Sequence, residues 1–286
     1  MPWPRKILIA CAFGLLVASP WVAATDTGTQ VFSAAVAASQ DDEQTLSLLT
    51  DLLEDPQLKP AERVDLLIRR SDIFLLTDRP DRARADLSEA ISIDPDSPTL
   101  FDRRGAAYLS ERKYDEALAD YRRAAALAPS DSEPWFGIGE AHRRLGQFEA
   151  AIEDYTQAIK RNDGVSRYFL FRGEARFAYG NLDGAISDLS KALELKGMIP
   201  AFTQRTFVQR ARVYGTLKQF GQSLADTDEA LKMNSNPFVT AEALKVRGYT
   251  YEQLGDKANA LDAYRKSLEL NPDDAWIANR LKKFTE

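Results

Sequence analysis

Histidine and cysteine, the side chains that most often carry metal binding and nucleophilic catalysis, are nearly absent from this sequence. The 286 residues contain one histidine, His142, and one cysteine, Cys11. Zinc sites and cysteine–histidine dyads need several such residues together, and no phosphate-binding loop of the form G-x-x-x-x-G-K-[S/T] occurs. Acidic residues are plentiful, but no spacing singles out a general acid and base. The sequence therefore predicts a protein that is not an enzyme and uses neither a metal nor a cofactor.

Arginine and aspartate recur at a fixed separation that predicts ion pairs. In four places an aspartate follows an arginine at the same distance along the chain: Arg70 and Asp86, Arg104 and Asp120, Arg172 and Asp188, and Arg210 and Asp226. Half-buried arginine rarely lacks a carboxylate partner, so we expect each pair to bridge two neighbouring helices. Arg247 has no aspartate at this separation, and Asp262 is its candidate partner.

Composition and net charge exclude several classes of partner. The chain is 44% hydrophobic and 28% charged, as expected for a folded soluble protein. The net charge of −6 provides no basic surface for nucleic acid or for an anionic membrane.

Small and aromatic residues recur along the chain with a constant period. In the segment that starts at Pro98, positions 4, 8, 11, 20, 24, 27 and 32 are Phe101, Gly105, Tyr108, Ala117, Tyr121, Ala124 and Pro129. The same register begins again at Val64, Ser132, Ser166, Gln204 and Ala241, with an insertion near Pro200. This pattern resembles the tetratricopeptide repeat. The resemblance implies an all-α fold, a right-handed superhelix (α-solenoid) in which each repeat is two antiparallel helices.

The resemblance also divides the chain into segments. It places six repeats at residues 64–97, 98–131, 132–165, 166–199, 204–237 and 241–274. Residues 41–63 and 275–286 are then amphipathic entry and capping segments, which give the terminal repeats a polar outer face. His142 falls at position 11, a packing position, so we expect it in or beside the core.

Residues 1–24 have the pattern of a cleaved secretory signal. Arg5 and Lys6 precede an uncharged apolar run, and Val22, Ala23 and Ala24 supply small residues for cleavage near Ala24. Residues 25–40 would follow as a flexible leader, and the protein would be periplasmic or secreted. Two alternatives stay open: an uncleaved membrane anchor, and a lipid on Cys11, because Leu8-Ile9-Ala10-Cys11 resembles a lipobox.

In the tetratricopeptide-repeat family, the first helix of each repeat lines a concave groove through positions 2, 5, 9, 12 and 13. The resemblance therefore implies a candidate partner-binding groove with these members: Phe136, Glu140, Arg143, Arg144, Arg167, Leu170, Glu174, Phe177, Arg205, Arg212, Lys245 and Tyr249. Arginine and aromatic residues, which are enriched in binding hot spots, dominate this set. An extended peptide with acidic and apolar side chains would suit such a groove.

The leading hypothesis is a periplasmic scaffold or adaptor that binds peptide or helical segments of envelope proteins. The alternative is a binding protein for cell-wall or exported polysaccharide, in which Trp135 would stack on sugar rings. The identity of the partner, the face that binds it and the oligomeric state stay open.

Overall fold

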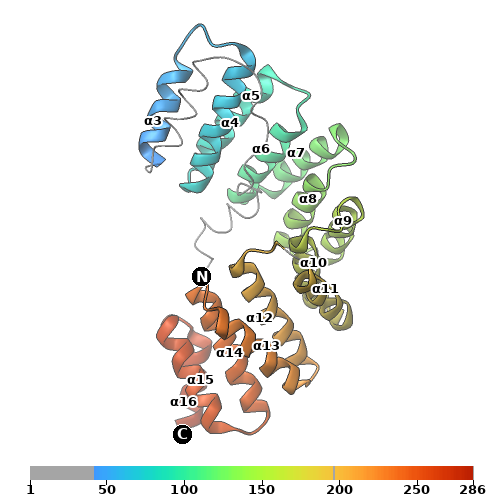
Figure 1. The fold of residues 1–286 in the computed structure, drawn as a ribbon, viewed down its shortest axis with the longest axis vertical. Helices are drawn as coiled ribbons and strands as arrows, with labels where there is room; N and C mark the ends of the chain where they lie inside the picture. Colours follow the sequence, from blue (N-terminus) through green and yellow to red (C-terminus); the bar gives the residue numbers. More distant parts are fainter. Residues whose placement is uncertain (1–41, 196, 286) are drawn as a thin grey trace. The chain divides into compact units, whose positions relative to one another are not determined.

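The computed structural model describes residues 42–195 and 197–285, and every regular element in this part of the chain is an α-helix (Figure 1). The predicted signal segment (1–24), with Cys11, and the predicted leader (25–40) lie outside the described residues. The helices form two compact units, one ending at Leu145 and the other beginning at Gly146.

The first unit contains the following helices in sequence order. They are α3 (Asp42–Leu53), α4 (Pro60–Leu76), α5 (Pro80–Ile93), α6 (Pro98–Ser110), α7 (Tyr114–Leu127) and α8 (Glu133–Arg144). Each packs on the next one along the chain, and α6 also contacts α8. Helix α3 lies within the predicted entry segment, and its Leu46, Leu49 and Leu53 are buried in the core around Leu67 and Leu87.

The second unit continues the same pattern. Its helices are α9 (Phe148–Arg161), α10 (Ser166–Tyr179), α11 (Leu182–Glu194), α12 (Pro200–Thr216), α13 (Phe220–Met233), α14 (Pro237–Gln253), α15 (Lys257–Leu270) and α16 (Ala275–Thr285). The first helices of consecutive repeats, α10, α12 and α14, contact one another as well as their own partners. The described chain is therefore an α-solenoid of helix hairpins.

Three of the first helices begin one turn before the predicted repeat starts at 64, 204 and 241. They begin at Pro60, Pro200 and Pro237, and each is 17 residues long. Proline is favoured in the first turn of a helix because its backbone needs no donor there. The insertion near Pro200 therefore lengthens α12 by a turn rather than forming a separate loop.

A left-handed backbone conformation ends the first helix of every repeat, at position 15. The residues there have φ between +57° and +92°: Asp78, Arg112, Gly146, Gly180, Lys218 and Gly255. Glycine adopts this conformation without strain, whereas a residue with a Cβ loses about 1 kcal/mol or more. At Asp78, Arg112 and Lys218 the tight turn between paired helices therefore forms in spite of this conformational cost.

Glycine is required where an aromatic ring lies against a helix backbone. The ring of Tyr121, on α7, lies between Gly105 of α6 and Gly137 of α8, and a Cβ added at Gly137 would be 2.6 Å from its Cδ1 atom. In the second unit, a Cβ at Gly248 would be 2.6 Å from the Tyr264 ring. Since real Cβ atoms do not approach so closely, these glycines set the separation of neighbouring helices.

Gly137→Ala is expected to lower the free energy of unfolding by about 1 kcal/mol, because the cost of overpacking exceeds the gain in helix propensity. Alanine gains about 1 kcal/mol in helix propensity, but overpacking costs about 1–3 kcal/mol, and the fixed Tyr121 ring cannot move aside. Urea denaturation followed by circular dichroism measures the change. Gly221→Ala, on α13, is the control because nothing lies within 4 Å of its added Cβ; equal stability of the two variants would contradict the prediction.

The predicted arginine–aspartate pairs are confirmed at all four places. Each arginine donates two hydrogen bonds, from Nε and Nη2, to both oxygens of its aspartate at 2.7–2.8 Å. Each pair joins the two helices of one repeat, and each aspartate is at most 6% exposed. Burial of the carboxylate raises the pKa of Asp86, and the hydrogen bond to Asp86 raises the pKa of Arg70.

Each of these arginines also reaches the preceding helix hairpin through a hydroxyl group. Arg104 bonds to Ser88, Arg172 to Thr156 and Arg210 to Ser190, all at position 25 of the repeat before, and Arg70 bonds to Thr50 of α3. One guanidinium group therefore links three helices. The repeat at 132–165 departs from this rule, because Ile138 stands at position 7 and Arg122 stands at position 25 of the repeat before it.

The predicted partner of Arg247 was wrong. Arg247 pairs with Asp228 of the preceding repeat and donates a hydrogen bond to the hydroxyl of Tyr251 at 3.0 Å, whereas Asp262 pairs with Lys266 one turn away. Asp228 occupies position 25, where the other repeats with this arginine carry a hydroxyl. The carboxylate that Arg247 lacks at position 23 is thus supplied by the neighbouring repeat.

Candidate functional site

Four of the candidate groove residues lie on α8 in the first unit. Phe136 and Glu140 are 3% and 4% exposed. Arg143 binds both oxygens of Glu140, at 2.7 and 2.9 Å, and Arg144 lies 3.7 Å from the same carboxylate. The structure thus brings these charges together within one helix, where they offset one another.

Two cationic candidates in the second unit are paired with acids from neighbouring elements. Arg205 of α12 binds both oxygens of Glu174 of α10, with Nε–Oε1 at 2.6 Å, and its guanidinium lies 5.1 Å from the centre of the Phe171 ring. Lys245 of α14 binds Asp274, before α16, at 2.7 Å. The Arg205–Glu174 pair joins consecutive repeats, and the Lys245–Asp274 pair joins α14 to the segment before α16, so these candidates have a structural role.

Arg212 and Phe177 form the accessible part of the candidate set. Arg212 is exposed, its guanidinium donates a hydrogen bond to Gln209 of its own helix, and no carboxylate of the described chain pairs with it. Its guanidinium lies 5.6 Å from the centre of the partly exposed Phe177 ring on α10. Tyr249 occupies the same repeat position as Arg212, in the next repeat along the chain, and is 39% exposed. We call Arg212, Phe177 and Tyr249 the α10–α14 surface.

The remaining two candidate groove residues are less accessible to a binding partner. Leu170 is fully buried. Arg167 is half-buried, with its guanidinium 5.4 Å from the centre of the Tyr168 ring.

The sequence reasoning missed Trp276, which is 41% exposed. Its ring lies 5.2 Å from Nζ of Lys245 and 5.4 Å from the guanidinium of Arg280, and Arg280 in turn binds Glu252. A tryptophan between two cations resembles a stacking platform. No local pattern in the sequence indicates this cluster, because Lys245 and Glu252 lie on α14 whereas Trp276 and Arg280 lie on α16.

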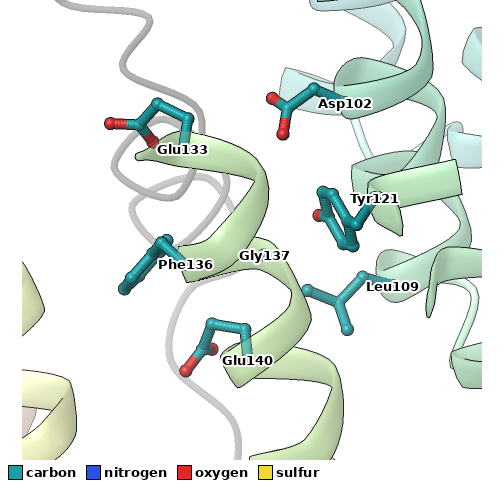
Figure 2. Close-up of a pocket in the computed structure, with 7 residues that line it drawn as sticks. All are labelled: Asp102, Leu109, Tyr121, Glu133, Phe136, Gly137 and Glu140. Atoms are coloured by element: carbon teal, nitrogen blue, oxygen red, sulfur yellow. The ribbon is translucent and has the colours of Figure 1, made fainter. Parts of the chain in front are cut away.

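A small hollow in the first unit collects several of the acidic and aromatic residues of α6, α7 and α8. Its lining is Asp102, Leu109, Tyr121, Glu133, Phe136, Gly137 and Glu140, around a cavity volume of only about 10 Å³ that opens to solvent (Figure 2). Only Phe136 and Glu140 belong to the predicted groove set. The other residues were missed because the hollow spans two repeats, and no single repeat displays the combination.

Two residues considered for chemistry have packing roles. His142 is half-buried, and Trp135 is partly buried against the core that contains Tyr121 and Ile138, which does not favour sugar stacking on it. Within the described residues, no group of three or more His, Cys, Asp or Glu could hold a metal ion. None of the described helices is both long and apolar enough to cross a membrane.

Consecutive helix hairpins, glycines against aromatic rings and a shared repeat register define the class of helical repeat proteins. Models of the tetratricopeptide repeat match residues 64–97, 103–155, 136–197 and 241–274, together more than half of the sequence. The chain belongs to the tetratricopeptide-repeat family. Proteins of this family generally mediate protein–protein interaction, so the class of function is that of an interaction scaffold.

Solved structures support the fold over almost the whole chain. The chain is similar to a protein in the crystal structure of the APC/C hetero-tetramer Cut9-Hcn1, with a TM-score of 0.72, 18% identity, and coverage of 99% of this chain and 53% of that one. It thus spans about half the length of that neighbour. YrrB, described as a tetratricopeptide-repeat protein with an unusual peptide-binding site, has a TM-score of 0.55 and 19% identity over 69% of this chain and 97% of its own.

Another structural neighbour is PilF of Pseudomonas aeruginosa. Its TM-score is 0.65 at 17% identity, with coverage of 78% of this chain and 99% of its own. No curated protein matches the sequence. At these identities the structural likenesses show the fold alone, and the function must be argued from the surface of this chain.

Proposed function

We propose that this protein is an extracytoplasmic adaptor that uses the α10–α14 surface to bind an extended segment of an envelope protein. The exposed Arg212 guanidinium over the Phe177 ring carries the proposal. Arginine is enriched in binding hot spots when a partner can desolvate it, and Arg212 is the groove arginine of the second unit that is exposed. Arg205, by contrast, is already bound to Glu174.

The chemistry of this surface favours an acidic and apolar segment. A guanidinium group offers two parallel N–H donors to a carboxylate, and Phe177 and Tyr249 offer ring faces beside it. Peptide binding by YrrB supports the fold's capacity for such a role. The periplasmic location rests on the signal pattern of residues 1–24.

Arg212→Ser is expected to weaken peptide binding by about tenfold or more, since truncation of a hot-spot arginine costs about 2 kcal/mol or more. The measurement uses a random peptide display library selected on the full chain, with the affinities of recovered peptides then determined by calorimetry. Recovered sequences should be enriched in Asp and Glu. Arg265→Ser is the matched control, because Arg265 is an exposed arginine on α15, the second helix of its repeat.

Equal affinity of the parent and Arg212→Ser for the recovered peptides would rule out the α10–α14 surface as the binding site. Loss of binding by Arg265→Ser instead would move the interaction to the second helices. Selection of peptides without acidic residues would contradict the proposed partner chemistry.

A further inference from the structure

Two aromatic rings are exposed at the C-terminal end of the second unit, where side chains of α14 and α16 meet. Tyr249 of α14 is 39% exposed and Trp276 of α16 is 41% exposed. Arg280 of α16 lies near both rings. Its guanidinium is 5.4 Å from the centre of the Trp276 ring, and its pKa is raised mainly by the hydrogen bond to Glu252, with a smaller contribution from Tyr249. The α10–α14 surface therefore continues from Tyr249 onto the capping helix.

The repeat register shows that the same two positions form a closed contact elsewhere in this unit. Tyr249 is at position 9 of its repeat, and Trp276 is at position 2 when the register is continued into α16. The corresponding residues of earlier repeats are Glu174 and Arg205, which bind each other through both carboxylate oxygens. Charged side chains close the contact there, whereas two exposed rings occupy it at the end of the array. Neighbouring exposed aromatic rings are typical of a binding surface.

Contacts within the protein hold the Trp276 ring in place. It lies edge-on to the fully buried Tyr264 ring, at 5.8 Å between centres. The Nζ atom of Lys245 lies 5.2 Å from the centre of the Trp276 ring, and Lys245 is itself bound to Asp274 at 2.7 Å. A guest that packs on the exposed part of the ring does not have to immobilise it first, and such preorganisation favours binding.

The charges near the two rings favour an aromatic guest over an acidic one. Arg280 binds both oxygens of Glu252, with Nε–Oε2 at 2.8 Å, and Lys245 is paired with Asp274. The side chains of Arg280 and Lys245 are still 30% and 27% exposed. Because each already has a carboxylate, an incoming ring gains more from them than an incoming acid does: its electron-rich face is attracted to a cation, and it can stack on the exposed rings.

We infer that the bound segment carries an aromatic side chain that packs between Tyr249 and Trp276. The inference rests on the proposed function, because it concerns the same extended segment that meets Arg212. Arg212 and Tyr249 lie on α12 and α14, which contact each other, and the axes of packed helices are about 8–10 Å apart. An extended chain advances about 3.3 Å per residue, so the aromatic residue should stand about three to five residues from the acidic residue that binds Arg212.

The test uses the full chain and the random peptide display library, with Trp276→Leu as the first variant. Peptides recovered on the parent should carry an aromatic residue about three to five positions from an acidic one. Trp276→Leu keeps an apolar group beside Tyr264 but removes the exposed ring, and should weaken binding about tenfold or more, as loss of an aromatic hot spot does. Tyr179→Leu, at an aromatic residue of α10 that is 54% exposed, is the control and should leave the affinity unchanged.

A double-mutant cycle tests whether the aromatic residue of the peptide contacts Trp276. Replacement of that peptide residue by leucine should weaken binding to the parent about as much as Trp276→Leu does. Because both changes remove one contact, Trp276→Leu should cost the leucine-substituted peptide no more than about twofold in affinity. Losses that multiply would place the aromatic residue of the peptide elsewhere and overturn the inference.

The outcomes separate this inference from the proposed function. If binding depends on Arg212 but tolerates both Trp276→Leu and the leucine-substituted peptide, the aromatic site is wrong and the proposed role of Arg212 stands. If these two changes weaken binding but Arg212→Ser does not, the aromatic site stands and the role of Arg212 is wrong. Recovered peptides without enrichment in aromatic residues overturn the inference, and recovery of no peptide overturns both. A circular dichroism melt like that of the parent shows that each variant is folded, and Tyr249→Leu, at an exposed position, replaces Trp276→Leu if it is not.

Discussion

Arg210→Met is expected to lower the free energy of unfolding by about 3 kcal/mol, because it strands a buried charge. Breaking a buried ion pair by removing one partner costs about 3–5 kcal/mol, since the remaining charge stays in the interior. Asp226 is 5% exposed and receives two hydrogen bonds from Arg210. The Arg210 side chain is 19% exposed, so some solvation of the remaining charge places the effect at the lower end of that range. Loss of the bond to Ser190 adds a weakening of the contact with the preceding repeat.

Urea denaturation of the parent and the variant measures this effect. Arg69→Met is the matched control, because Arg69 and Asp65 form an exposed pair within one helix, and such pairs contribute about 0.5 kcal/mol or less. The double variant Arg210→Met/Asp226→Leu should recover most of the loss, since apolar replacement of both partners removes the stranded charge. A double variant as unstable as Arg210→Met would show that the loss comes from something other than that charge.

Tyr264→Ala is expected to lower the free energy of unfolding by about 4 kcal/mol, as large-to-small changes of buried aromatic residues do. Tyr264 is fully buried. Its ring lies edge-on to Trp276, at 5.8 Å between centres, and to Phe284, at 6.2 Å, both on α16. Removing the ring therefore removes the surface on which α16 packs, together with the contact to Gly248.

Hydrogen exchange of the α16 amides gives a local measurement of this change, and urea denaturation gives the global one. We expect the amides of α16 to lose protection first. Tyr264→Phe should cost only about 1 kcal/mol, because it removes the hydrogen bond to Glu252 and keeps the ring. Unchanged protection of α16 in Tyr264→Ala would mean that the helix is held by Ile277 and not by the Tyr264 ring.

The sequence was sufficient to predict the hairpins and the pairs within a repeat. Glycine and aromatic residues at fixed offsets specify which helix faces approach, and the constant separation along the chain places Arg104 beside Asp120 on adjacent helices. These interactions are local, so one repeat contains all the information needed.

Interactions between repeats were harder to predict. The pairing of Arg205 with Glu174, and of Arg247 with Asp228, depends on which positions of neighbouring hairpins meet. The extra turn at the start of α12 and α14 changes the number of residues between these positions along the chain, although the same positions of neighbouring repeats still meet in the structure. The hollow around Tyr121 was missed for the same reason, because its acids come from two different repeats.

The hydroxyl group at position 25 limits which repeats of the array can be deleted during evolution. Serine or threonine at this position precedes an arginine, whereas Arg122 precedes Ile138. Excision of residues 132–165 by recombination would bring Arg122 against Arg172, and two guanidinium groups would meet where a guanidinium and a hydroxyl group meet now. Two positively charged guanidinium groups in contact repel each other. Deletion of the repeat at residues 132–165 is therefore disfavoured, because it would leave the two repeats on either side of it mismatched at this contact.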